Sequence, residues 1–247
     1  MWMQSHVVVV VPALDEAPRI GRVLRGMPAC VDAIVVVDDG SRDGTAELAR
    51  ASGDARVEVL RHERNRGVGA AIATGYRRAV ARTNLPRDAF VVMAGDGQMD
   101  PADLPGLVGP IARGDADYVK GDRFQRPGVV RDMPVARLVG GLAFSWATSR
   151  AIGVRVQDSQ CGYTAIAREA CLGLDLDALW PRYGYPNDLL SQLAIRGRRI
   201  AEAPVRAVYA DEVSRLKARH VPVVAALVAR AWVRRLASRR GAPARPS

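Results

Sequence analysis

The chain has 247 residues, 49% of them hydrophobic and 25% charged, which is the balance of a folded protein and not of a disordered one. Its three cysteines lack the spacing of a disulfide framework or a zinc site, which favours reduced thiols and a cytoplasmic location. The net charge of +10 is concentrated in residues 206–247, which hold ten Lys+Arg against two Asp+Glu. Such a segment favours a polyanionic partner, either nucleic acid or an anionic membrane surface.

The first half of the chain alternates between apolar strands and helices. Strands are predicted over 7–12, 33–39, 56–62, 88–95 and 115–121, each rich in β-branched or aromatic residues. Helices are predicted over 17–28, 44–52 and 67–82, with Asp43 and Asp100 placed to cap helices. Strands separated by helices in this way predict an α/β fold with a mostly parallel central sheet and helices on both faces.

The second half of the chain is less regular. A helix is predicted over 134–152, a loop entering a strand over 158–166, and a loop, a helix and a last strand over 183–205. The apolar stretches are shorter than the roughly 20 residues that span a bilayer, and the N-terminus lacks the basic start of a signal peptide. We expect a main domain over 1–210, a basic amphipathic C-terminal helix over 211–240 and a disordered tail over 241–247.

Polar residues follow five of the predicted strands. They occupy positions 12–16, 38–41, 65–67, 96–98 and 121–123. In parallel sheets ligands bind beyond the carboxyl ends of the strands. A single Asp at such a place is usually a helix cap, whereas five polar segments on one sheet edge favour a site for a polar, phosphate-bearing ligand.

The motifs VPALDEAP, VVDDGSRDGT, NRGVGAAIATGYRRA, MAGDGQMDP, KGDRF and DSQCGYTAI follow one another in this order. In them the chain resembles the family 2 glycosyltransferases with the GT-A, Rossmann-like fold, and in particular the dolichyl- or polyprenyl-phosphate sugar transferases. The resemblance covers about residues 7–208. It implies metal-dependent, inverting transfer of one hexose from a nucleotide-diphosphate sugar to a polyprenyl phosphate. The Q-x-x-R-W signature of processive synthases is not found, which favours transfer of a single sugar.

The resemblance also implies which residues bind the donor. The nucleotide pocket would be lined by Pro12, Ala13, Asp15, Glu16 and Asp39, with Asp39 accepting hydrogen bonds from the base. Gly67 and Gly69 would let the backbone approach the nucleotide closely. Lys217 lies near the position of a basic residue that faces the donor diphosphate. For Asp38 we favour a turn before the next helix. GDP-mannose and UDP-glucose remain alternative donors.

The run 96–98 is similar to the metal-binding run of the family. Asp96 would supply a carboxylate and Gln98 a carbonyl oxygen to Mg²⁺ or Mn²⁺, hard cations that prefer oxygen ligands. The family often has a further Asp two residues earlier, where this chain has Ala94. We therefore expect weaker metal binding that depends more on the donor diphosphate.

Two arginines are candidates for the acceptor side. Arg123 matches an arginine that faces the acceptor phosphate in the polyprenyl-phosphate branch, and a guanidinium suits a phosphate. Arg137 is a looser match and could equally be a surface residue of its helix. A hydroxyl acceptor would instead need a general base, for which Asp158 and Asp188 are candidates, although either could be structural.

Several alternatives remain open at this stage. The acceptor could be a soluble metabolite or glycan. Nucleic-acid binding by the basic tail is disfavoured, because only 5% of residues are aromatic. Cys161 is expected to be a buried thiol and His62 a strand-end residue, neither of them catalytic. We interpret the basic C-terminal segment as a peripheral contact with anionic lipid at the inner face of the membrane.

Overall fold

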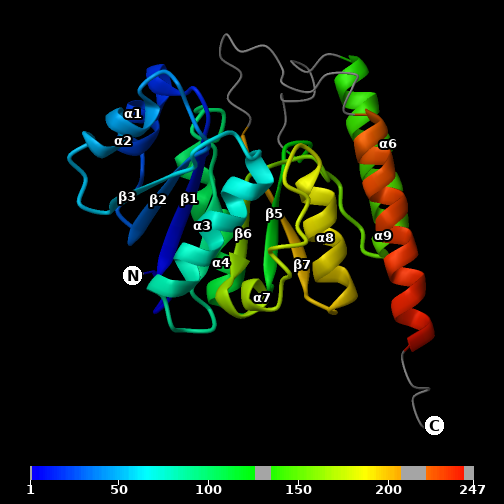
Figure 1. Cartoon of the computed structure of the whole chain (residues 1–247). Helices are drawn as coiled ribbons and strands as arrows, with labels where there is room; N and C mark the ends of the chain where they lie inside the picture. The colour runs from blue at the N-terminus through cyan, green and yellow to red at the C-terminus, as the bar shows by residue number, and fades with distance from the viewer. Residues whose placement is uncertain (1, 126–134, 207–220, 242–247) are drawn as a thin grey trace.

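The computed structural model describes residues 2–125, 135–206 and 221–241, without the side chains of 135–137 and 239–241 (Figure 1). Within these residues one seven-stranded sheet has the order β3-β2-β1-β4-β6-β5-β7. Its strands are β1 (Val7–Ala13), β2 (Ala33–Asp38), β3 (Val57–Arg61), β4 (Ala89–Val92), β5 (Tyr118–Asp122), β6 (Thr164–Ala167) and β7 (Ile200–Pro204). The predicted mostly parallel sheet is confirmed, and β6 alone runs antiparallel to its neighbours β4 and β5.

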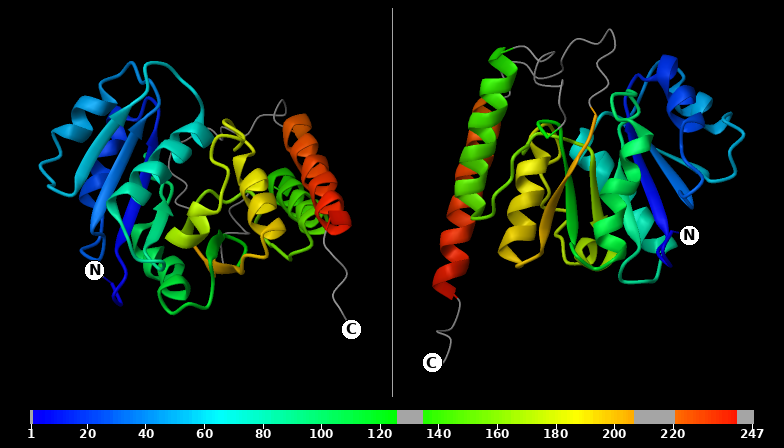
Figure 2. Two further views of the ribbon diagram at one scale, coloured as in Figure 1. Left: turned by 60° about the horizontal axis from the view of Figure 1, so that its bottom comes forward. Right: turned by 180° about the vertical axis from the view of Figure 1, so that it is seen from behind.

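Helices cover both faces of the sheet (Figures 1 and 2). They are α1 (Ala17–Arg25), α2 (Thr45–Arg50), α3 (Val68–Arg82), α4 (Leu104–Ala112), α6 (Val135–Ile152), α7 (Arg168–Leu172), α8 (Tyr185–Ile195) and α9 (Val221–Gly241), with a 3-10 turn η1 (Pro101–Asp103) before α4. The central strand β1 explains the layering, since all seven of its residues are buried. A parallel strand covered on both faces needs such an uninterrupted apolar run.

The two predicted caps fix how helices leave the sheet. Asp100 accepts a hydrogen bond from the Ala102 N–H at 2.9 Å, which confirms it as the cap of η1. Asp43 accepts from the Thr45 N–H at 3.1 Å, as predicted for the start of α2. It also accepts from the Ala17 N–H at 2.9 Å. One carboxylate therefore joins the N-termini of α1 and α2 beside the ends of β1 and β2.

The basic C-terminal helix α9 packs on the rest of the fold. It lies beside α6 and α8 at the β7 side of the sheet (Figure 2). Val224, Leu227 and Ala231 form its buried face, so we describe α9 with the main fold and not as a separate segment. Of the tail expected over 241–247, Gly241 instead ends α9, and residues 242–247 lie outside the described residues. In the part of the chain that the structure describes, the helices fall short of the length and apolar character that a bilayer crossing requires.

Candidate active site

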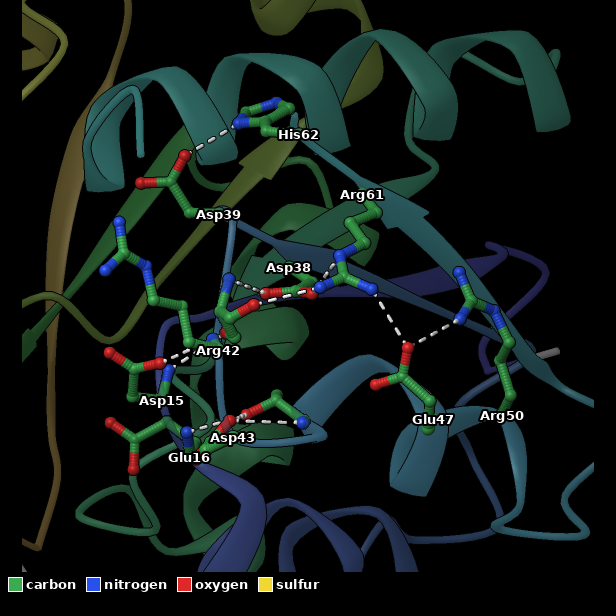
Figure 3. Close-up of polar contacts among 12 residues, drawn as sticks. Asp15, Glu16, Asp38, Asp39, Arg42, Asp43, Glu47, Arg50, Arg61 and His62 are labelled. Carbon is green, nitrogen blue, oxygen red and sulfur yellow. Dashed lines mark hydrogen bonds and ion pairs between the residues drawn. The ribbon is translucent and has the colours of Figure 1, made fainter. Parts of the chain in front are cut away.

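A cleft of about 730 Å³ opens at the carboxyl ends of β1, β2 and β3. It is lined by residues 14–15 after β1, 40–42 after β2 and 61–65 at the end of β3 and beyond it. We call it the β1–β3 cleft. Three of the polar segments predicted to share one sheet edge therefore meet there. Two aspartates precede the lining residue Gly40 in the sequence and contact other lining residues. Asp38 contacts Arg61, and Asp39 contacts His62 (Figure 3).

Asp15 connects the loops after β1 and β2. Its backbone has a φ of 53°, a left-handed conformation that Asp tolerates better than most residues. Its N–H donates to Ser41 Oγ at 2.9 Å, and its Oδ1 accepts from the Arg42 N–H at 2.9 Å. Asp15 lines the β1–β3 cleft, and these bonds fix its carboxylate there, while its contact with a nucleotide stays a prediction.

Asp38 holds the turn that begins the second loop. Its side chain is fully buried, and Oδ1 accepts from the Ser41 N–H at 2.9 Å, so the interpretation as a turn residue is confirmed. Arg61 Nε lies 3.2 Å from Asp38 Oδ2, while Arg61 Nη2 donates to the Ser41 carbonyl at 2.9 Å. The contact with buried Asp38 therefore holds Arg61 at the wall of the β1–β3 cleft.

Asp39 has a different role from the one expected. Its carboxylate, 3% exposed, accepts from the Arg66 N–H at 2.9 Å and the Gly67 N–H at 2.7 Å. His62 Nδ1 lies 2.7 Å from the same carboxylate, and His62 Nε2 lies 3.0 Å from Thr74 Oγ1. Three protein donors bind this buried carboxylate, which argues against its expected contact with a nucleotide base. Asp39 instead holds the loop that leads into α3.

His62 was predicted as the last residue of a strand and lies one residue after the end of β3, and its pairing with Asp39 was missed. The two residues are 23 positions apart in the sequence. They come together because Asp39 follows β2 and His62 follows β3, two strands that pair in parallel. Since a carboxylate only accepts hydrogen bonds, the proton of this contact sits on Nδ1. The only signal in the sequence was the shared place of both residues at a strand end.

Gly67 and Gly69 give room to protein backbone. A Cβ added at Gly67 would lie 2.4 Å from the Pro181 carbonyl oxygen, and one at Gly69 would lie 2.1 Å from the Trp180 carbonyl oxygen. The Ala70 N–H donates to the Pro181 carbonyl at 3.1 Å. The expectation that these glycines admit a nucleotide is corrected, because residues 180–181 fill the space beside them.

The other expected donor residues connect β1 to its neighbours. The Pro12 carbonyl accepts from the Gly95 N–H at 3.0 Å, and the Ala13 carbonyl accepts from the Asp39 N–H at 2.9 Å. Glu16 is 2% exposed, and its Oε2 accepts from Arg19 at 2.9 Å. Through these contacts the backbone or side chains of three residues support the β1–β3 cleft, namely Pro12, Ala13 and Glu16.

The segment 96–98 follows β4, which pairs with β1, so it lies near the loop after β1. Asp96 and Gln98 are half-buried, and Asp96 Oδ1 accepts from the Gln98 N–H at 3.0 Å. Within the described residues, no group of three His, Cys, Asp or Glu side chains is arranged to hold a metal ion. Asp96 and the Gln98 amide offer the oxygen atoms that a hard cation prefers, with one carboxylate between them. They fit such an ion if the donor diphosphate supplies further ligands.

Half-buried Arg123, just after β5, pairs with the buried carboxylate of Asp158. Arg123 Nε and Nη2 donate to the two Asp158 carboxylate oxygens at 2.6 and 2.9 Å, and the Asp158 side chain is 1% exposed. Burial raises the pKa of Asp158, but hydrogen bonds and charge attraction from Arg123 outweigh it and leave the pKa below its ordinary value. A carboxylate held in this way is a poor base. We therefore correct the candidate base role of Asp158, and the expected acceptor phosphate would meet an Arg123 already bonded to Asp158.

Asp188 is also unsuited to the role of base. Its side chain is 1% exposed. Its Oδ2 accepts from the Trp180 N–H at 2.9 Å, and its Oδ1 accepts from Arg234 Nη1 on α9 at 2.5 Å. Arg230 Nη1 lies 4.0 Å from the same oxygen. These arginines could not be assigned from the sequence, because nothing local relates Asp188 to residues more than 40 positions later.

Three further residues were singled out in the sequence, namely Cys161, Arg137 and Lys217. Cys161 is a free, buried thiol, as predicted, and burial raises its pKa, which keeps it protonated. Arg137 lies on α6, but its side chain is outside the described residues. Lys217 also falls outside them.

Comparison with known proteins gives consistent matches. The family model described as "Glycosyl transferase family 2" matches residues 8–172. The UDP-N-acetylglucosamine–dolichyl-phosphate N-acetylglucosaminyltransferase of Methanococcus voltae is 29% identical over 83% of this chain and 86% of that protein. The undecaprenyl-phosphate mannosyltransferase of Micrococcus luteus is 31% identical over 81% and 82%. The glucosyl-3-phosphoglycerate synthase of Mycobacterium tuberculosis, solved with Mn²⁺, UDP and phosphoglyceric acid, is 26% identical with a TM-score of 0.61, covering 98% of this chain and 81% of that one.

Proposed function

Because the chain belongs to glycosyl transferase family 2 and is a glycosyltransferase, we propose that it transfers one hexose from a nucleotide-diphosphate sugar to a polyprenyl-phosphate-type acceptor, with inversion at the anomeric carbon. Family membership confirms the resemblance inferred from the motifs, including the resemblance to the polyprenyl-phosphate branch.

The hydrogen bonds of Asp158 and Asp188, the two candidate bases, favour a phosphate over a hydroxyl as the acceptor. Asp158 and Asp188 are both buried, and protein donors bind both oxygens of each carboxylate. A sugar hydroxyl needs a base to remove its proton. A phosphate monoester is already anionic near neutral pH, since its second pKa is about 6. A phosphate acceptor therefore suits a site in which neither carboxylate is available, and the names of the relatives agree with it.

The donor would bind in the β1–β3 cleft. Its wall combines the Asp15 carboxylate with the guanidinium groups of Arg42 and Arg61, so it offers acceptors to ribose hydroxyls and positive charge to phosphate. Support for a UDP-type donor comes from the solved synthase, which binds UDP. The mannosyltransferase among the relatives supports a mannose donor equally.

A divalent cation, Mg²⁺ or Mn²⁺, would be held by Asp96 and the amide oxygen of Gln98. When bound, it would supply positive charge that stabilises the leaving diphosphate. Asp96 follows Gly95, whose N–H donates to the Pro12 carbonyl of β1 at 3.0 Å, so this segment lies beside the carboxyl end of β1 on the β4 side. The solved synthase holds Mn²⁺ together with UDP, which supports this cofactor.

We propose that the protein acts in the cytoplasm, peripherally at the inner face of a membrane. Helices α6 and α9 lie side by side at the outside of the molecule (Figure 2). Both helices have exposed apolar side chains, which we call the α6–α9 apolar surface. Its members are Val139, Leu142, Trp146, Trp232, Val233 and Leu236, between 47% and 70% exposed. Basic residues beside exposed Trp and Leu are typical of helices that lie on a lipid surface, and Arg230 of α9 is 42% exposed.

A soluble acceptor is the second candidate. The solved synthase is similar to this chain over 98% of its length and binds phosphoglyceric acid. Both candidates share the donor chemistry and differ in whether the product extracts into an organic solvent.

The test is a transfer assay on the full chain. Labelled UDP-glucose and GDP-mannose are each incubated with Mn²⁺ and either a polyprenyl phosphate or phosphoglyceric acid. We expect label in the butanol-extractable product and loss of transfer on chelation. Label found only in water-soluble product would contradict the lipid acceptor. No transfer to either acceptor would contradict the proposed donors.

The Asp96→Ala variant tests the metal site in the same assay. We expect a loss of about 100-fold or more in transfer, because charge stabilisation by a metal ion amounts to several kcal/mol. The matched control is Asp100→Asn, four residues later, which keeps the oxygen that caps η1. Asp96→Ala with the activity and metal dependence of the wild type would refute the assignment.

A further inference from the structure

We propose that α9 positions the wall of the β1–β3 cleft, acting through Asp188 and the segment 180–185, so that the placement of α9 and the affinity for the nucleotide are coupled. This inference rests on the proposed function only in taking a nucleotide as the ligand of the cleft. Arg234 and Asp188 are then positioning residues. A chain of four contacts carries the argument.

The first contact joins α9 to the start of α8. Arg234 Nη1 donates to Asp188 Oδ1 at 2.5 Å, and the Asp188 side chain is 1% exposed. A buried carboxylate that loses its charged partner destabilises its surroundings strongly. The position of α9 is therefore tied to Asp188, which lies in the first turn of α8.

The second contact is apolar packing at the same place. A Cβ added at Gly184 would lie 2.7 Å from Leu227 Cδ1 and 3.8 Å from Val224 Cγ2, both of α9. Gly184 has a φ of 98°, a conformation that L side chains rarely adopt. Glycine is needed there for its backbone and for its size, so α9 packs directly over segment 180–185.

The third contact connects that segment to α3. Asp188 Oδ2 accepts from the Trp180 N–H at 2.9 Å. The Pro181 carbonyl accepts from the Ala70 N–H at 3.1 Å. The backbone of 180–181 fills the space that glycine leaves at Gly67 and Gly69. The Asp188 carboxylate therefore binds Arg234 of α9 with one oxygen. With the other oxygen it binds the backbone of Trp180, which packs against the start of α3.

The fourth contact reaches the cleft. The Gly67 N–H donates to Asp39 Oδ2 at 2.7 Å, and Asp39 Oδ1 lies 2.7 Å from His62 Nδ1. His62 lines the β1–β3 cleft. Packed and hydrogen-bonded groups are thus continuous from α9 to the cleft, and such a network can carry energetic coupling between the two.

The test compares two neighbouring arginines of α9 in the full chain. Arg234→Met removes the partner of Asp188. Arg235→Met is the matched control, because Arg235 Nη1 donates to the Arg150 carbonyl of α6 and lies away from segment 180–185. The measurements are the Kd for UDP with Mn²⁺, by calorimetry, and hydrogen exchange of the amides of residues 66–72.

We expect Arg234→Met to weaken UDP binding by about tenfold, within the usual range of coupling between sites, and to speed exchange at 66–72. Arg235→Met should change the Kd by less than about twofold. The double variant Asp188→Asn with Arg234→Met keeps an acceptor for the Trp180 N–H and removes the buried charge. It should restore UDP affinity to within about threefold of the wild type, and it covers the case in which Arg234→Met does not fold.

Three results would contradict the coupling between α9 and the β1–β3 cleft. Arg234→Met with wild-type affinity and wild-type exchange at 66–72 would overturn it, and so would an equal loss in Arg235→Met. A folded double variant that stays as weak as Arg234→Met would show that Asp188 is not the route. If the wild type binds no nucleotide, the proposed function fails instead, and the exchange at 66–72 still decides whether α9 supports α3.

Discussion

Replacing Gly69 by alanine tests how closely α3 and segment 180–185 approach each other. The new Cβ would lie 2.1 Å from the Trp180 carbonyl oxygen, whereas a carbon and an oxygen normally stay about 3.3 Å apart. The oxygen belongs to the backbone, so it cannot rotate away as a side chain would. Overpacking of this kind costs about 1–3 kcal/mol. Alanine gains about 1 kcal/mol over glycine inside a helix, so the cost exceeds the gain.

The expected result is a lower thermal stability and weaker UDP binding. The difference between that cost and that gain is a net loss of up to about 2 kcal/mol, which corresponds to a fall in Tm of up to roughly 8 °C for a chain of this size. The matched control is Gly106→Ala in α4, where among the described residues no atom lies within 4 Å of the added Cβ. There we expect a gain of about 0.5–1 kcal/mol and a Tm higher by about 1–4 °C.

Differential scanning calorimetry of both variants with and without UDP gives the answer. The same substitution should have opposite signs at the two glycines. If Gly69→Ala raises the Tm as Gly106→Ala does, then residues 180–181 do not press on α3 as described. The reasoning that connects α9 to the β1–β3 cleft would then lose its third contact.

Two further outcomes follow from the pairing of Arg123 with Asp158 and from the exposed helix face. Asp158→Asn should cost about 3–5 kcal/mol at pH 7, since Arg123 loses its charged partner. Because the folded-state pKa of Asp158 lies below its ordinary value, this difference is full above about pH 4 and disappears as the pH falls through the folded-state pKa. A gap in Tm that is constant from pH 7 to pH 3 would contradict it. Trp232→Ser combined with Val233→Ser should weaken sedimentation with phosphatidylglycerol vesicles by at least about tenfold, since each buried side chain contributes about 1.5–3 kcal/mol. Leu48→Ser, at an equally apolar exposed site on α2, should change it little, and equal effects would argue against a specific surface.

The fold could be predicted from the sequence where the signal was local. The apolar run of β1 and the caps at Asp43 and Asp100 depend on residues within a few positions of one another, and all were predicted. The reversal of β6 was not, because a buried strand of four residues has the same composition in either direction.

The candidate site was predictable in its place but not in its contacts. The polar segments after β1, β2 and β3 had to meet, since parallel strands end at one edge. Asp38 could be assigned to a turn because Ser41 is three residues away. The donors to Asp39 come from 23 to 28 positions later, and the partner of Asp188 comes from 46 positions later. Only the folded chain brings such groups together, so residue types and spacing could not assign them.

The contact between Asp188 and Arg234 also has a consequence for synthesis on the ribosome. Chains fold from the N-terminus as they emerge, and β1 to β4 can pair once residue 92 has been made. The backbone that packs against Gly67 and Gly69 is present only after residues 180–181 have been made. The Asp188 carboxylate gains its partners from α9 only after residues 230 and 234 have been made. The β1–β3 cleft is therefore among the first parts of the molecule to take shape and among the last to be held in its final form.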